Sequence, residues 1–412
     1  MSEKLIGACV FGQSGGPTSV INASAYGVIK TALEAPEITK VYGAAHGIVG
    51  VLGDDLYDLD HEDPSELELL LNTPSSELGS CRYKLDDDKD FERILEVFKK
   101  YDVRYFFYNG GNDSMDTCSK ISQYMEKAGY ECRVMGVPKT IDNDLVGTDH
   151  CPGYGSAAKY IATSVAEVYK DAKVYDTGTI TILEIMGRHA GWLTGAAALA
   201  GLADCPPDFV YLPEIPFDMD DFLHNVETAY KEKGNCIVAV SEGISYADGT
   251  FVSHAKISAT DGFGHAQLGG LAMLLGAKVR NKIGAKVRAI ELSLLQRCGA
   301  HLASQTDIDE AFLAGKSAVE FAVAGESGKM VAFTREDDGG KYKCGVMTEP
   351  LTICANVEKT VPREWINEAG TNVTQEFIDY ALPLIQGENT RKTASGLPRF
   401  ANLKKIKADL SK

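Results

Sequence analysis

Two carboxylates beside a lysine and a hydroxyl form the most chemically suggestive segment of the chain. Lys139 and Thr140 stand just before Asp142, and Asp144 follows two residues later. One carboxylate in such a turn can act as a general base while the other meets a metal ion or backbone amides. The lysine can neutralise a phosphate. An Asx turn, whose carboxylates cap nearby amides, is the structural alternative.

Two glycine-rich turns could bind an anion through their backbone. Residues 110–114 read Gly-Gly-Asn-Asp-Ser, and residues 14–16 read Ser-Gly-Gly. Glycines let backbone amides approach a ligand closely, and the helix expected after each turn directs its N-terminal amides to the same place. Neither turn fits a Walker A loop or a dinucleotide fingerprint. A tight strand–helix turn capped by Asp113 or Ser114 is the alternative.

Arginines at three places could complete an anion site. Arg188 follows Met186 and Gly187, at what the sequence predicts to be the start of a helix reaching about residue 200. Arg288 and Arg297 lie further along the chain and carry guanidinium forks that suit a terminal phosphate.

Short apolar runs that read as buried strands precede these turns. The expected strands are residues 5–11, 103–108, 132–137, 179–185 and 236–240. Strands alternating with helices imply parallel sheets, and ligands bind outside the carboxyl ends of such strands. The sequence therefore predicts an α/β protein with mainly parallel sheets, in which five polar turns share one edge and form the site.

Length and composition limit the class of protein. The 412 residues predict two domains, with a crossing near 154–160 and a return near 297. Acidic residues outnumber basic ones, 58 to 41, for a net charge of −17, which argues against nucleic-acid or anionic-membrane partners. No apolar run is long enough to span a bilayer, and the ten cysteines form no CxxC pair. We therefore expect a cytoplasmic protein with reduced thiols.

Charged stretches at three places lie outside the polar turns. Residues 54–68 and 86–90 are acid-rich, and solvated loops are the expectation for both. The last two dozen residues are basic, which predicts a surface tail or arm.

Taken together, the polar turns resemble the 6-phosphofructokinases, particularly the pyrophosphate-dependent branch. The matching segments occur in family order over roughly residues 5–300. The segments Pro-Lys-Thr-Ile-Asp-Asn-Asp at 138–144 and Met-Gly-Arg at 186–188 are the most specific matches. Supporting matches are residues 14–16 with Asn22, 79–82, 110–114, 242–243, Arg288, and 296–297.

The resemblance implies reversible transfer of a phosphoryl group from pyrophosphate to O1 of fructose 6-phosphate, with Mg²⁺, giving fructose 1,6-bisphosphate and phosphate. Asp142 matches the family's base, and Arg188 matches the arginine that stabilises the transferring group. The residues implied to bind the sugar phosphate are Thr140, Ile141, Asp142, Asp144, Met186, Gly187, Arg188, Glu242, Arg288 and Arg297. Those implied on the donor side are Gly15, Arg82, Gly111, Asp113, Ser114 and Lys139.

The same resemblance implies two Rossmann-like lobes with the active site in the cleft between them. Residues 1–155, completed by part of 297–350, would bind the donor. Residues 156–296, completed by part of 351–412, would bind the sugar phosphate. Because the family's Arg288 counterpart reaches a neighbouring subunit, the resemblance also implies a homodimer or homotetramer.

Donor identity depends on Asp113 and Lys139, since ATP-dependent relatives carry glycine at both positions. A carboxylate at Asp113 would occupy the place of the nucleotide α-phosphate and exclude ATP by bulk and like charge. Asn112 replaces an aspartate that ligates magnesium in many relatives, so Asn112, Asp113 or pyrophosphate itself would hold the ion. Thr179 replaces a phosphate-binding arginine, which leaves sedoheptulose 7-phosphate open as acceptor. An ATP-dependent kinase and a non-catalytic regulatory subunit that binds sugar phosphate are open as well.

Overall fold

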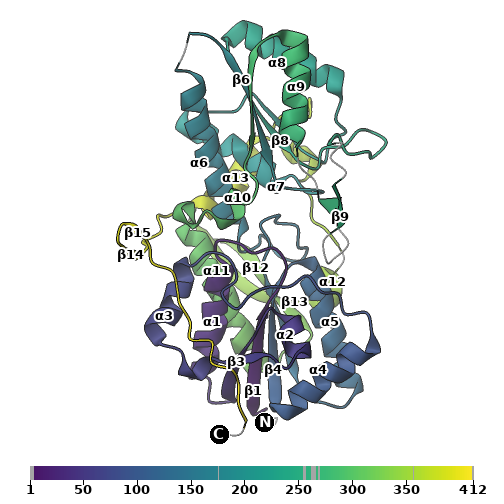
Figure 1. The fold of residues 1–412 in the computed structure, drawn as a ribbon, viewed down its shortest axis with the longest axis vertical. Coiled ribbons are helices and arrows are strands. Elements are labelled where there is room, and N and C mark those ends of the chain that lie inside the picture. The colour runs from purple at the N-terminus through teal and green to yellow at the C-terminus, as the bar shows by residue number, and fades with distance from the viewer. Residues whose placement is uncertain are drawn as a thin grey trace.

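The protein folds into two α/β lobes stacked along its long axis (Figure 1). This computed structural model describes residues 4–174, 176–253, 257–260, 266–267, 270–355 and 357–410. The N- and C-termini lie at the same end of the molecule, below the larger lobe in Figure 1. No helix in the described part of the chain is long and apolar enough to cross a membrane.

The larger lobe is built on a seven-stranded sheet in the order β13-β12-β5-β4-β1-β2-β3. Its strands are β1 (Gly7–Gln13), β2 (Ile38–Ala44), β3 (Leu56–Asp58), β4 (Val103–Gly110), β5 (Arg133–Pro138), β12 (Lys329–Asp337) and β13 (Tyr342–Pro350). The five inner strands pair in parallel, while β3 and β13 are antiparallel at the edges. This parallel core confirms the predicted α/β class.

Helices cover both faces of this sheet, so alternate residues of a strand enter different cores. Ala8 and Val10 of β1 pack on the side of α4 and α5, whereas Cys9 and Phe11 pack on the side of α1 and α11. Burial on both faces explains why the strand is almost continuously apolar. The helices of this lobe are α1 (Ile21–Glu34), α2 (Ile48–Leu52), α3 (Pro64–Leu69), α4 (Asp88–Lys100), α5 (Asn112–Lys127), α11 (Gln305–Val323) and α12 (Leu351–Cys354).

The smaller lobe has a four-stranded parallel sheet in the order β11-β6-β8-β7. Its strands are β6 (Thr179–Ile185), β7 (Phe209–Tyr211), β8 (Cys236–Ser241) and β11 (Lys286–Glu291). One face packs against α8 and α9, and the other against α6, α7 and α13. The helices are α6 (Tyr154–Ala172), α7 (Trp192–Gly195), α8 (Met219–Lys233), α9 (Leu271–Ile283), α10 (Leu295–Cys298) and α13 (Gln375–Ala381).

Short elements complete the described chain. The remaining strands are the antiparallel pairs β9 (Ile257–Thr260) with β10 (Ala266–Gln267) and β14 (Thr393–Ala394) with β15 (Leu397–Pro398). Single-turn or slightly longer 3-10 helices are Leu59–His61, Leu70–Asn72, Ala196–Ala203, Ala300–Leu302, Arg363–Trp365 and Leu382–Ile385.

Two predictions about the polar turns are wrong. The five turns do not share one sheet edge: three follow β1, β4 and β5, and two follow β6 and β8 of the other sheet. Arg188 does not begin a helix, because Gly187 turns the chain with φ of 134° and α7 starts only at Trp192.

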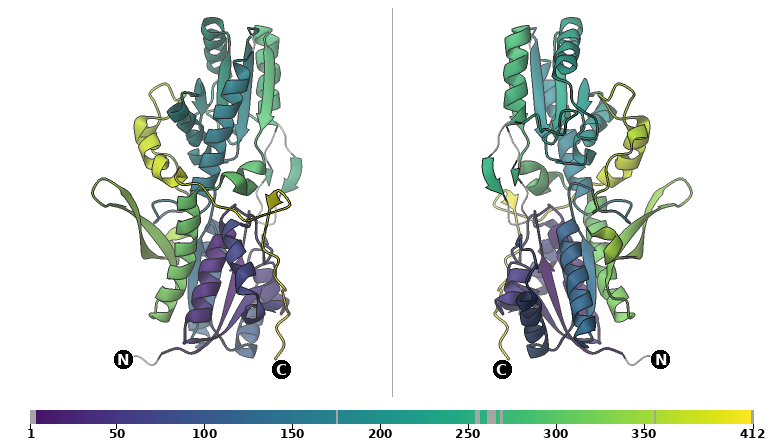
Figure 2. Two further views of the ribbon diagram at one scale, coloured as in Figure 1. Left: turned by 90° about the vertical axis from the view of Figure 1, so that its left-hand side faces the viewer. Right: turned by 90° about the vertical axis from the view of Figure 1, so that its right-hand side faces the viewer.

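The basic C-terminal segment, predicted as a surface arm, runs along the larger lobe (Figure 2). Its side chains pair with the acidic stretch 54–68, as in the ion pairs Lys392–Glu68 (3.0 Å) and Arg399–Glu66. That acidic stretch, expected to be a solvated loop, contains β3 and α3. Backbone hydrogen bonds from Asp58 to Ile406 (2.8 Å) and from Ala408 to Leu56 (2.9 Å) also join the two segments, and exposed ion pairs by themselves contribute little stability.

Candidate active site

The turns after β1, β4 and β5 lie side by side because these strands are in parallel register. Gln13 is opposite Asn109, and Gly110 is opposite Pro138. Backbone hydrogen bonds continue past the strand ends, from Ser14 N to Asn109 O (2.9 Å) and from Lys139 N to Gly110 O (3.0 Å). The sheet thereby brings together the three turns of the larger lobe that carry most predicted site residues.

Three cationic side chains converge on the turn after β1. Lys139 donates from Nζ to the carbonyl oxygen of Gly16 (2.7 Å). A Cβ placed on Gly16 would lie 3.0 Å from Nη1 of Arg297 and 3.4 Å from Nη2 of Arg82. Gly15 has φ of 74°, a left-handed conformation that glycine adopts without strain. This concentration of positive charge against bare backbone suits a polyanion such as a diphosphate.

Burial lowers the pKa of Lys139 to about 8, and the positive charges of Arg82 and Arg297 act in the same direction. The negative charge of Asp142 opposes this shift. An anion bound among these three cations would offset their mutual repulsion and so raise the pKa of Lys139. Arg297, which the resemblance implies to bind the sugar phosphate, comes from α10 and reaches the same turn as Arg82.

The two carboxylates after β5 lie opposite these cations. Burial raises the pKa of Asp142 to about 7, and the negative charges of Asp144 and Glu242 raise it further. Burial and the charge of Glu358 also raise the pKa of Asp144. The backbone N–H of Asp142 donates to Oγ1 of Thr140 (3.1 Å), which fixes the turn. A carboxylate with a pKa near 7 is suited to exchange a proton at neutral pH.

The turn after β4 offers an amide oxygen to a cation. Helix α5 begins at Asn112, with Gly111 as its N-cap and without a side-chain cap, so capping by Asp113 or Ser114 does not explain this sequence. Nδ2 of Asn112 donates to Oδ2 of Asp144 (3.1 Å). Its Oδ1 is buried and has no hydrogen-bond partner in the part of the chain that the structure describes. A buried, unsatisfied oxygen beside carboxylates fits a hard divalent cation.

Residues of the smaller lobe form the second wall. The backbone N–H of Gly187 donates to Oε1 of Glu242 (3.3 Å), and that of Met186 donates to Oε1 of Gln296 (3.3 Å). Burial raises the pKa of Glu242, while the nearby Arg188 opposes the shift. The charge of Glu242 acts on Asp142 across the lobes. The structure thus brings Glu242, Met186 and Gly187 to the same site as the larger lobe's turns.

Two predicted positions lie elsewhere in this chain. Arg288 is on the edge strand β11 and forms an ion pair with Asp171, near the end of α6. Thr179 is the first residue of β6, at the end of the strand opposite Met186. Neither residue is joined to the cluster by a contact that the structure records among its described residues.

The sequence did not point to the segment around Lys359, which forms hydrogen bonds with residues of both walls of the site. Its backbone N–H donates to the carbonyl of Asp144 (2.7 Å), and its Nζ donates to the carbonyl of Asp149 (2.8 Å). Nε1 of Trp192, just after the Met-Gly-Arg turn, donates to the carbonyl of Lys359 (2.8 Å). No local pattern marks this lysine, because its partners are far away in sequence.

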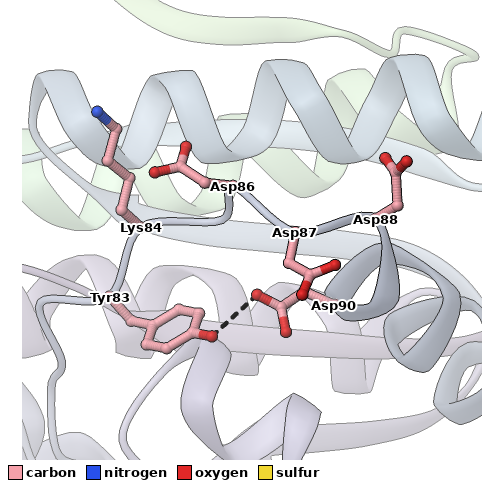
Figure 3. Close-up of a pocket in the computed structure, with 6 residues that line it drawn as sticks. All are labelled: Tyr83, Lys84, Asp86, Asp87, Asp88 and Asp90. Atoms are coloured by element: carbon pink, nitrogen blue, oxygen red, sulfur yellow. Dashed lines mark hydrogen bonds between the residues drawn. The ribbon is translucent and has the colours of Figure 1, made fainter.

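An acidic hollow on the larger lobe is lined by residues that follow Arg82 in the sequence (Figure 3). It is lined by Tyr83, Lys84, Asp86, Asp87, Asp88 and Asp90. Asp87 accepts from the backbone of Lys89 (3.0 Å) as the N-cap of α4, and Tyr83 donates to Asp90 (2.9 Å). These carboxylates therefore stabilise the start of a helix.

Comparison with known proteins supports the geometry. The phosphofructokinase family model matches residues 9–322. The chain is 46% identical over 407 residues to a protein of Halomonas elongata named pyrophosphate–fructose 6-phosphate 1-phosphotransferase, covering 97% of this chain and 96% of the relative. A protein of the same name from Methylococcus capsulatus is 45% identical over 401 residues, covering 95% of each chain.

A solved structure agrees over nearly the whole length. The crystal structure of a pyrophosphate-dependent phosphofructokinase from Nitrosospira multiformis superposes with a TM-score of 0.90 at 40% identity, covering 98% of each chain. Enzymes of this kind are phosphotransferases that generally need a divalent metal. The matched region contains the turns after β1, β4, β5, β6 and β8 that build the site, and by this match the chain belongs to the phosphofructokinase family.

Proposed function

We propose that the protein transfers a phosphoryl group from pyrophosphate to O1 of fructose 6-phosphate, reversibly, giving fructose 1,6-bisphosphate and phosphate. The observation that carries this proposal is the convergence of Lys139, Arg82 and Arg297 on the bare backbone of Gly16, opposite Asp142. The names of relatives more than 40% identical support it.

In this mechanism Asp142 accepts the proton of the 1-hydroxyl as its oxygen attacks phosphorus. Phosphoryl transfer needs positioning and charge stabilisation more than covalent help, so the cations matter as much as the base. Arg188 lies near Glu242 on the wall formed by the smaller lobe and would stabilise the transferring group. We infer that the larger lobe binds the donor and the smaller lobe binds the sugar phosphate.

We assign Mg²⁺ as the metal, held by Asn112 and Asp113 at the start of α5. The unpartnered Oδ1 of Asn112 and the carboxylate in the first helical turn are oxygen donors of the kind that Mg²⁺ prefers. When bound, the ion would neutralise charge on the diphosphate.

The exposed edge position of Arg288 supports a homo-oligomer, in which β11 faces a second subunit. We infer a homodimer or homotetramer, which sedimentation of the purified protein would distinguish. The ten cysteines are free thiols, which suits a cytoplasmic location.

A coupled assay with pyrophosphate and ATP in parallel tests the proposed donor. We expect kcat/KM with pyrophosphate to exceed that with ATP by about 100-fold, since like charge at Asp113 opposes a nucleotide phosphate. Fructose 6-phosphate and sedoheptulose 7-phosphate serve as parallel acceptors. A higher kcat/KM with ATP would show that the proposed donor is wrong.

The pH profile of kcat/KM should be bell-shaped. Asp142, whose pKa is about 7, must be deprotonated to accept a proton, so the forward rate rises with pH through that value. Lys139, whose pKa is about 8, must be protonated to bind the donor, so the rate falls above it. Lys139→Arg should move the alkaline limb upward, because arginine stays charged. An acid limb near pH 4 would contradict the assignment of Asp142.

A further inference from the structure

Asn143, between the two carboxylates of the site, has a left-handed backbone that needs support. Its φ is 56°, and its side chain is fully buried. Its Nδ2 donates to Oη of Tyr380 (2.8 Å), and its Oδ1 accepts from the backbone N–H of Cys151 (2.9 Å). Asparagine tolerates this conformation better than most non-glycine residues, and the two side-chain bonds fix it here. Because the backbone angle at Asn143 sets the relative directions of Asp142 and Asp144, these two bonds orient both carboxylates.

Tyr380 comes from α13, more than two hundred residues later in the chain. Its hydroxyl accepts from Asn143 and donates to the carbonyl oxygen of Asp149 (2.7 Å), so both of its hydrogen-bonding functions are used. Burial raises the pKa of Tyr380 well above the usual range, which keeps the hydroxyl protonated and able to donate. The hydroxyl thus bridges two points of one loop, residues 143 and 149.

Arg335 holds Tyr380 in this position. Its guanidinium lies over the Tyr380 ring at 4.7 Å and donates to the Tyr380 carbonyl (3.1 Å). It also forms a two-point contact with the Asp149 carboxylate, from Nε (3.1 Å) and Nη2 (3.0 Å). Charge-assisted, two-point contacts of this kind are among the strongest and most directional in proteins.

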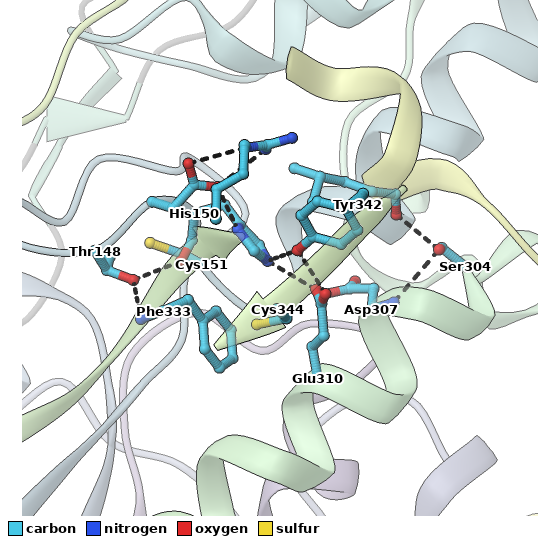
Figure 4. Close-up of polar contacts among 12 residues, drawn as sticks. Thr148, His150, Cys151, Ser304, Asp307, Glu310, Phe333, Tyr342 and Cys344 are labelled. Atoms are coloured by element: carbon cyan, nitrogen blue, oxygen red, sulfur yellow. Dashed lines mark hydrogen bonds and ion pairs between the residues drawn. The ribbon is translucent and has the colours of Figure 1, made fainter. Parts of the chain in front are cut away.

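Asp149 is also part of a polar network that includes His150, Glu310 and Tyr342 (Figure 4). His150 contacts Asp149 through Nδ1 (2.8 Å) and Glu310 through Nε2 (2.7 Å), and Glu310 accepts from Oη of Tyr342 (2.6 Å). Burial lowers the pKa of His150, but hydrogen bonds to the two carboxylates outweigh burial and raise it. Because each ring nitrogen faces a carboxylate oxygen, the geometry fits the doubly protonated imidazolium, which donates to both. Two cations, Arg335 and His150, therefore balance two anions.

This network is better explained as a scaffold than as a metal centre. His150, Glu310 and Cys344 bring potential ligand atoms within 4.8 Å of one another. However, both ring nitrogens of His150 already bond directly to carboxylates, and a metal ion would need one of them. The network instead fixes the position of Asp149. Asp149 in turn fixes Tyr380, which bonds to the loop.

We propose that Tyr380 is a positioning residue for the phosphoryl transfer, whose hydroxyl holds Asn143 in its left-handed conformation and so aims Asp142 at the acceptor oxygen. This inference rests on the proposed function. It assigns Tyr380 a role in the chemical step that is exerted through Asn143 rather than through substrate contact.

Tyr380→Phe removes only the hydroxyl and tests this role. We expect kcat to fall by about 10–100-fold, because a misplacement of about 1 Å costs about that much, while both KM values stay within about threefold. Tyr130→Phe is the matched control, since its hydroxyl also donates to backbone carbonyls, of Phe98 (3.1 Å) and Val103 (3.0 Å), outside the site. That control should leave kcat unchanged. Unchanged kcat in Tyr380→Phe, or a raised KM alone, would overturn the proposal.

A double-mutant cycle separates positioning from a general structural role. Asn143→Gly keeps the left-handed backbone accessible but removes both side-chain bonds, to Tyr380 and from the Cys151 N–H. If the hydroxyl acts through Asn143, adding Tyr380→Phe to Asn143→Gly should lower kcat no further. Additive losses would refute the coupling. Should Tyr380→Phe not fold, Asn143→Gly alone tests the bond, with the same expected loss of kcat and with unchanged kcat as the contrary result.

Assaying the wild-type protein in the same way distinguishes failure of the proposed function from failure of the proposed role of Tyr380. If the wild type does not use pyrophosphate and fructose 6-phosphate, the proposed function fails. The fold-changes of the variants are then measured with whichever donor and acceptor the wild type does use, and they still decide the role of Tyr380.

Discussion

Asp142→Asn should lower kcat by about 10²–10⁴-fold, the usual contribution of a general base. The amide keeps the size of the side chain but cannot accept the proton of the 1-hydroxyl. Because burial raises the pKa of Asp142 to about 7, the native carboxyl is poised to take up and release a proton at neutral pH. An amide in the same place has no such equilibrium.

Binding of fructose 6-phosphate should change much less in this variant. Titration calorimetry with the sugar phosphate alone should give a Kd within about threefold of the wild type, since removing one negative charge near a phosphate does not weaken binding. Asp142→Ser, which also removes the carboxylate, should show the same loss of turnover. Near-normal turnover in either variant would mean that another group is the base.

The double variant Asp113→Gly, Lys139→Gly should shift donor preference from pyrophosphate toward ATP by about 10²–10³-fold in the ratio of kcat/KM values. Lys139 is buried with its Nζ bonded to the Gly16 carbonyl, so its loss removes one of three cations around the donor. Asp113 lies in the first turn of α5, where it adds negative charge at the start of the helix. Its removal opens that position to a nucleotide phosphate.

The single variants serve as controls for this switch. Lys139→Gly alone should lose pyrophosphate activity without gaining ATP use, because Asp113 still repels the nucleotide. Asp113→Gly alone should gain some ATP use and lose part of its pyrophosphate activity, because Asp113 is also assigned as a ligand of Mg²⁺. Parallel kinetics with both donors measure each ratio. If the double variant uses pyrophosphate as well as the wild type does, the two residues do not select the donor.

Local patterns in the sequence were sufficient for the five strands that precede the polar turns and for the chemistry of those turns. The strands expected at 103–108 and 179–185 correspond to β4 and β6, because short apolar runs bounded by polar turns are typical of buried strands. Lys139, Asp142 and Gly15 could be identified because each lies in a short motif of neighbouring residues whose types suggest its chemistry. The family resemblance lies in those contiguous segments, and the family match confirms it.

Only the tertiary structure decided which strands share a sheet and which distant side chains complete the site. Strand pairing is a non-local choice, so five similar strand–turn units could not be divided between two sheets from their sequences. Arg297 lies beside Arg82 and Gly16, and Tyr380 bonds Asn143, through contacts between residues more than two hundred positions apart. The sequence by itself determined the reactive groups, whereas packing between the lobes determined their directions and their pKa values, because burial and neighbouring charge arise only when the chain is folded.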